Sequence, residues 1–130
     1  MWQQINPNPQ GLNVGDCVVR AICLATGKAW ADVFMGIAAE GYRLCDMPSA
    51  NRVWGSYLMA NGYERHGLPE SCPVCYNVKD FAKDHPKGCF ILALDGHVVC
   101  IRDGDWLDTW DSADRSPLFY WQKSDQKEDD

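Results

Sequence analysis

The feature that most constrains the fold is a pair of apolar segments joined by Asp103-Gly104. The segments are HVVCIR (97–102) and DWLDTW (105–110), and an Asp-Gly pair between two such segments is a strong signal for a two-residue β-hairpin turn. In that register Arg102 pairs with Asp105, and every further cross-strand partner follows from this pair. The sequence therefore predicts antiparallel strands here, and it also predicts which side chains share a face.

Segments on either side of the hairpin complete the prediction of an α+β fold. CFILAL (89–94) is a continuous apolar run, as expected of a central strand, and PLFYWQ (117–122) is the fourth predicted strand. The N-terminal half instead repeats apolar residues at helical spacing. Helices are predicted from Val18 to a stop at Gly27, over 30–41, from Pro48-Ser49 to Asn61-Gly62, and over 78–84. Helices followed by an antiparallel sheet are typical of the α+β class.

Composition limits the domain organisation and the partners. The 130 residues, 46% of them hydrophobic, are predicted to form one globular domain over 1–123, with an extended lead-in over 1–14 and an acidic, disordered tail over 124–130. A net charge of −6 disfavours binding to nucleic-acid phosphates. We expect no membrane association, since no apolar run approaches the roughly 20 residues of a span. An odd number of cysteines, seven, and an N-terminus unlike a signal peptide favour a reducing, cytoplasmic location.

The hairpin register makes a prediction about a histidine and a carboxylate. With a two-residue turn, His97 lies opposite Trp110 and Asp108 lies opposite Val99, so His97 and Asp108 are diagonal neighbours on one face. Asp111 would then point to the other face. A three-residue turn would pair His97 with Asp111 instead, but the Asp-Gly signal favours the first register.

A single cysteine at a predicted helix start supplies a group for this pair to act on. GDCVVRAI (15–22) places Cys17 where the helix dipole and free N–H groups stabilise a thiolate. An adjacent imidazole would make Cys17 an activated nucleophile, and a carboxylate would fix the imidazole tautomer. The sequence thus nominates Cys17, His97 and Asp108 as nucleophile, base and orienting acid, with the Cys17 backbone N–H as one oxyanion donor.

These residues resemble the papain-like cysteine peptidase superfamily, through the pieces GDCVVRAI, GHVVCI and DTWD. In that family the third residue is followed by a small residue and a Trp that shields the His, a pattern matched by Asp108, Thr109 and Trp110. An Asp in the third place is usual in transglutaminase-like enzymes and bacteriocin-leader peptidases, and the latter also carry an Asp before the Cys, as Asp16 does here. The whole chain also resembles small papain-like proteins from phages and gut bacteria, and the resemblance covers most of residues 13–111.

The resemblance also shows where this sequence departs from the family. The oxyanion Gln of papain-like enzymes usually lies six residues before the Cys, but Gly11 stands there, so Gln10 and Asn13 are the candidates for that role. Val18 replaces the Gly that follows the Cys in the family.

The resemblance implies a minimal papain-like fold, with the nucleophile helix packed on an antiparallel sheet of about four strands. The implied activity is a cysteine peptidase or amidase that cleaves a peptide or isopeptide bond of a peptide or protein substrate without a metal or cofactor. Transfer of the acyl group to an amine, as in transglutaminases, and a non-catalytic interaction module on the same fold are the alternatives. The oligomeric state stays open.

The remaining cysteines and histidines carry weaker signals. CPVC has the spacing of zinc ligands, but a single CxxC is weak and the His spacings fit no common pattern. We therefore predict a loop with two thiols and no bound zinc; the four residues concerned are His66, Cys72, Cys75 and His85. Four other cysteines are expected to be buried, inert thiols: Cys23, Cys45, Cys89 and Cys100. Cys89 and Cys100 lie in apolar predicted strands, and the sequence places no acid or base beside them.

Overall fold

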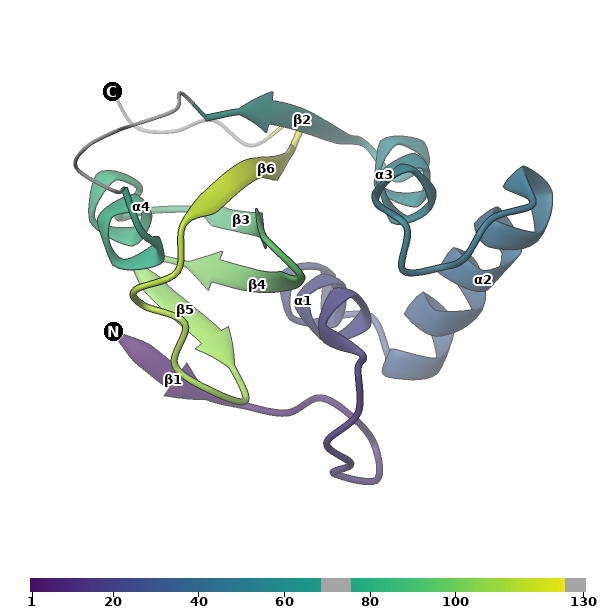
Figure 1. Ribbon diagram of the computed structural model, residues 1–130, viewed down its shortest axis with the longest axis horizontal. Coiled ribbons are helices and arrows are strands. Elements are labelled where there is room, and N and C mark those ends of the chain that lie inside the picture. The colour runs from purple at the N-terminus through teal and green to yellow at the C-terminus, as the bar shows by residue number, and fades with distance from the viewer. Residues whose placement is uncertain (69–75, 126–130) are drawn as a thin grey trace.

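The computed structural model describes residues 1–68 and 76–125, and Figure 1 shows helices gathered around a twisted sheet. The helices are α1 (Cys17–Thr26), α2 (Trp30–Leu44), α3 (Asn51–Ala60) and α4 (Val78–Asp84). The strands are β1 (Trp2–Gln4), β2 (Tyr63–Gly67), β3 (Cys89–Leu94), β4 (His97–Arg102), β5 (Asp105–Asp108) and β6 (Pro117–Lys123). The α+β class is as predicted.

Local signals in the sequence account for several of the helix ends. Gly27 ends α1 in the left-handed conformation, with φ of 77°, which glycine adopts without steric cost. Asn77 begins α4 with a capping box: its side chain accepts the N–H of Asp80, and the Asp80 carboxylate accepts the N–H of Asn77. Helix α2 continues three residues beyond the predicted 30–41 and ends at Leu44, before Cys45 turns left-handed with φ of 55°.

The hairpin between β4 and β5 has the predicted register. Arg102 pairs with Asp105, and Ile101 with Trp106. The two turn residues, Asp103 and Gly104, both have positive φ, 49° and 82°, as a type I′ turn requires. The two-residue turn is therefore confirmed, and with it the relative placement of the side chains on β4 and β5.

The sheet is larger than predicted and is not purely antiparallel. It has six strands in the order β1-β5-β4-β3-β6-β2, and β1 pairs in parallel with β5. The expectation of about four antiparallel strands was therefore wrong, and part of the extended lead-in is an edge strand. Both missed strands lie at the edges and carry mostly exposed side chains, WQQ and YERHG. Edge strands are held mainly by backbone hydrogen bonds to one neighbour, so they need no alternation of apolar residues.

The core lies on both faces of the sheet. On one face α1, α2 and α3 pack against inward side chains of β3, β4 and β6, around Ile22, Trp54 and Ile91. On the other face α4 packs through Phe81 against Phe90 and its neighbours. Strand β3 is thus buried on both sides, which explains its uninterrupted apolar sequence. In Figure 1, α1 lies directly beside β4, and this contact positions the site.

Within the part of the chain that the structure describes, no single helix is long and apolar enough to cross a membrane. Helices α1 and α2 satisfy that test of length and composition only when they are taken together, and they are bent by 119° relative to each other.

Candidate active site

Cys17 is the first residue of α1 and faces β4. Its side chain is half-buried, and it lies at the helix terminus where backbone N–H groups are not used within the helix. Burial by itself raises the pKa of the Cys17 thiol. This effect is outweighed by the hydrogen bond and charge of His97, by the backbone N–H of Val98 and by the charge of Arg20, so the pKa of Cys17 is lowered. These contacts all favour the thiolate.

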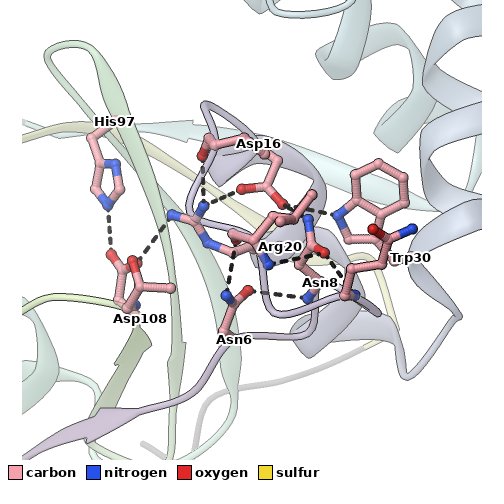
Figure 2. A network of polar contacts seen from close by, with 11 residues as sticks. Asn6, Asn8, Asp16, Arg20, Trp30, His97 and Asp108 are labelled. Atoms are coloured by element: carbon pink, nitrogen blue, oxygen red, sulfur yellow. Dashed lines mark hydrogen bonds and ion pairs between the residues drawn. The ribbon is translucent and has the colours of Figure 1, made fainter.

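His97, the first residue of β4, is held between Cys17 and Asp108. Its Nε2 lies 2.5 Å from Oδ2 of Asp108 at the end of β5 (Figure 2), which leaves Nδ1 for the thiol. Burial lowers the pKa of His97, but the hydrogen bonds and charges of Asp108 and Cys17 prevail and raise it to about 9. A raised imidazole pKa beside a lowered thiol pKa favours a thiolate–imidazolium pair.

Asp108 rather than Asp111 meets the imidazole, as the two-residue turn predicts. The other oxygen of Asp108, Oδ1, accepts the backbone N–H of Thr109 at 2.7 Å, so both oxygens have partners. Asp111 points elsewhere, because its Oδ1 accepts the indole N–H of Trp106 at 2.8 Å and the N–H of Ala113 at 3.0 Å. Asp108 therefore binds His97, whereas Asp111 binds Trp106 and the backbone of Ala113.

The predicted shielding residue lies against the imidazole. The rings of Trp110 and His97 have centroids 4.7 Å apart and are inclined by 43°. Trp110 is itself 39% exposed, so it covers one side of the histidine while its other side meets solvent. The side chain of His97 is only 8% exposed, which keeps water from the bond to Asp108.

The structure does not bring the predicted oxyanion side chains to Cys17. Gln10 and Asn13 are both exposed, and neither is among the described residues that line the pocket beside Cys17. The reason is local: the loop closes on the side chain of Asn8, which accepts the N–H of Gln10 at 2.9 Å and that of Leu12 at 3.3 Å. This turn directs residues 10–13 to solvent.

A pocket of about 690 Å³ opens beside Cys17 and His97. Its wall is largely apolar, and its floor and sides come from α1, α2 and α3, with β6 at the rim. The principal apolar side chains are Val18, Trp30, Phe34, Ile37, Trp54 and Leu118. The exposed β3–β4 turn at Asp95 and Gly96 forms part of the mouth. A largely apolar pocket beside a few polar groups is the usual form of a ligand site.

Sequence reasoning missed Arg20, which is buried beside the site. Its guanidinium lies between the carboxylates of Asp16 and Asp108 (Figure 2). One signal in the sequence could have indicated this ion pair. Asp16 and Arg20 lie four residues apart across a helix start in GDCVVRAI, the spacing at which opposite charges meet on a helix. Nothing in the sequence reports the contact between Arg20 and Asp108, which are 88 residues apart.

The candidate zinc ligands do not form a site among the described residues. Cys72 and Cys75, to which part of this prediction applies, lie outside the described residues. His66 stacks on Tyr120 with centroids 5.0 Å apart, and His85 stacks on Phe81 at 3.9 Å. Within residues 1–68 and 76–125, no group of three or more His, Cys, Asp or Glu side chains could hold a metal ion.

One of the thiols expected to be inert has charged surroundings. Cys89 lies 3.8 Å from the sulfur of Cys100 and directly across from Arg102 in the sheet. The hydrogen bond with Cys100 lowers the pKa of Cys89; burial opposes this effect, and the Arg102 charge reinforces it, so the pKa of Cys89 is lowered. The expectation that no charged partner lies beside Cys89 was therefore wrong. For Cys23 burial is the main cause that raises the pKa, to about 11, which fits an inert thiol.

No family model matches the chain, and no curated protein or solved structure is significantly similar to it. The function must therefore be inferred from the arrangement of Cys17, His97 and Asp108 and from the pocket beside them.

Proposed function

We propose that the protein is a thiol-dependent acyl-transfer enzyme, a small cysteine peptidase or amidase with a papain-like catalytic arrangement. The observation that supports this most is the placement of the His97 imidazole, which bonds Asp108 at 2.5 Å through Nε2 and contacts the Cys17 thiol at the start of α1. Nucleophile, base and orienting acid come from three different elements and meet at one end of a pocket.

The chemistry follows from the groups present. The Cys17 thiolate attacks the carbonyl carbon of a peptide or isopeptide bond, and the resulting oxyanion is met by the Cys17 backbone N–H at the helix start. The His97 imidazolium then gives its proton to the leaving amine, and the C–N bond breaks to leave a thioester. Neutral His97 next accepts a proton from water, whose oxygen attacks the thioester; the C–S bond breaks, the acid is released and the thiolate–imidazolium pair is restored. Asp108 keeps the imidazole oriented throughout.

The pocket indicates the class of acyl group. Its apolar wall, which includes the stacked rings of Trp30 and Phe34 with centroids 5.1 Å apart, favours a peptide with a bulky apolar side chain near the scissile carbonyl. The described residues that line the pocket include no Lys or Arg, so an acidic side chain there would be desolvated without such a partner, and it would also approach the exposed carboxylate of Asp95. We therefore expect apolar or aromatic acyl groups to react before acidic ones.

A non-catalytic role on the same fold is the second candidate. The observation that favours it is the position of Gln10 and Asn13, which point to solvent and supply no side-chain oxyanion donor to the pocket. In that case the pocket would hold a peptide segment of a partner without cleaving it. Turnover separates the two candidates, because a binding module would show saturable binding without acyl-enzyme formation.

The test begins with thiol reactivity and ends with acyl transfer. Limiting iodoacetamide at about pH 6.5, followed by peptide mapping, should modify Cys17 first. Activated ester or anilide derivatives of Phe, Leu, Gly and Asp peptides should then acylate Cys17 and release their alcohol or amine in that order of decreasing rate, and Cys17→Ser should abolish the release. Cys89→Ser is the matched control, since it removes the other thiol of lowered pKa and leaves the site intact. An unmodified Cys17 beside a rapidly modified Cys89 would refute the proposal.

A further inference from the structure

We propose that Arg20 is a positioning residue of this site: its guanidinium links the nucleophile helix to Asp108 and keeps that carboxylate directed at His97. The inference rests on the proposed function of Cys17, and it assigns a role to a side chain that does not contact the reacting atoms. Arg20 is only 5% exposed, and a charge buried to that degree requires partners.

The partners of Arg20 lie on both sides of the site. Nη2 donates to Oδ1 of Asp108 at 3.4 Å, and Nη1 donates to the carboxylate of Asp16 and to the carbonyl oxygen of Val14 at 3.3 Å. Figure 2 shows the guanidinium between the two carboxylates, with His97 on the far side of Asp108. The planar fork of a guanidinium can donate in two directions at once, which a lysine ammonium at the same depth cannot do with equal geometry.

The contacts of Asp108 explain how Arg20 positions it. Oδ1 is held by Arg20 and by the N–H of Thr109 at 2.7 Å, so Oδ2 is left for the imidazole of His97. Rotation of the carboxylate away from His97 would break these bonds in a buried environment. Arg20 also lies one turn after Cys17 on α1, whereas Asp108 ends β5. The ion pair therefore fixes the distance between the helix that carries the sulfur and the strand that orients the imidazole.

Asp16 holds the other end of the guanidinium and connects it to the pocket. As the residue before α1, Asp16 makes no side-chain capping bond to the helix. Its Oδ2 instead accepts Nδ2 of Asn8 at 3.2 Å and the indole N–H of Trp30 at 3.0 Å. Trp30 lines the pocket, so a continuous set of polar contacts runs from the pocket wall through Arg20 to Asp108.

The charges around Cys17 determine the sign of the expected effect. Among the described residues, the charged or titratable side chains that face Cys17 or its partners are Asp16, Arg20, Asp95, His97 and Asp108. Arg20 is the cation among them that contacts both Asp16 and Asp108. Its loss removes a positive charge that favours the Cys17 thiolate, and it leaves Asp16 without its guanidinium partner and Asp108 with His97 as its cationic partner. The pKa of Cys17 should therefore rise.

The experiment measures the pH dependence of Cys17 alkylation by iodoacetamide from about pH 4.5 to 9.5 in a Cys89→Ser background. Arg20→Gln should move the midpoint upward by about one pH unit, which slows alkylation at acidic pH about tenfold. Arg20→Lys should recover part of the shift, because charge is restored but not the fork. Arg52→Gln is the matched control, since Arg52 forms an exposed pair with Asp46 at 2.7 Å and is not among the described residues that line the pocket, and its midpoint should not move.

Asp16→Asn supplies a second perturbation of opposite sign, which matters if Arg20→Gln does not fold. Without the Asp16 charge, the guanidinium is less neutralised beside Asp108 and Cys17, so the midpoint should move downward. A midpoint unchanged in folded Arg20→Gln, or a shift of both Arg20→Lys and Asp16→Asn in the same direction, would overturn the role of Arg20. A parent protein whose Cys17 titrates near the ordinary thiol value of about 8.5 would instead refute the proposed function.

Discussion

Replacing Asp108 by Ala should show that Asp108, and not its neighbour Asp111, is the acid that orients His97. The substitution removes the oxygen that lies 2.5 Å from Nε2 of His97. In the intact site, burial lowers the pKa of His97 but Asp108 and Cys17 raise it to about 9. Without Asp108, burial is opposed only by Cys17, and the imidazolium becomes much less favoured at neutral pH.

The magnitude follows from that pKa. The ordinary imidazole pKa is about 6.5 and the value in the site is about 9, so the surroundings favour the imidazolium by roughly 300-fold in total, at tenfold for each pH unit. Part of this stabilisation of the imidazolium comes from Cys17, and part comes from Asp108. We therefore expect Asp108→Ala to slow the alkylation of Cys17 at pH 5.5 to 6.5 by about 10- to 100-fold.

The assay is the second-order rate of iodoacetamide alkylation across pH, in a Cys89→Ser background, with the labelled peptide identified by mapping. Asp111→Ala is the matched control: it removes a carboxylate three residues away whose Oδ1 accepts the indole N–H of Trp106 at 2.8 Å. It should lower the melting temperature and leave the pH profile of Cys17 unchanged. If Asp111→Ala reduces the acidic reactivity of Cys17 while Asp108→Ala does not, the assignment of the orienting acid is refuted.

Three further outcomes are expected. Alkylation near neutral pH should be fastest at Cys17, slower at Cys89 and slowest at Cys23. Cys23 is last because burial raises its pKa to about 11, and faster labelling of Cys23 would contradict this order. Metal analysis of dialysed protein should find well under one zinc per chain. The free energy of unfolding should change little from about pH 6.5 to 9, since folding adds a proton to His97 and removes one from Cys17. In Cys17→Ser, where Asp108 but no thiol raises the pKa of His97, it should fall as the pH rises above about 6.5, and the fall should be centred below pH 9. Urea titrations measure this.

Short-range features of the sequence determined the central part of the fold and the pairing of His97 with Asp108. Asp103-Gly104 allows positive φ at both turn positions, so it selects a two-residue turn, and a period of two along the strands then places His97 and Asp108 on one face. The helix over 78–84 and the strands over 89–94 and 97–102 were predictable for the same reason. Each depends on patterns read within a few residues.

Tertiary structure decided the features that depend on distant partners. Strand β1 exists because β5 offers it a free edge, and neither its composition nor its pattern signals this. Arg20 meets Asp108 because α1 packs beside β4 and β5. Gln10 and Asn13 point to solvent because the loop closes on Asn8, and Cys89 lies across from Arg102 through the pairing of β3 and β4. Turn chemistry and periodicity are local, whereas buried charge pairs and edge strands are set only when segments far apart in the chain come into contact.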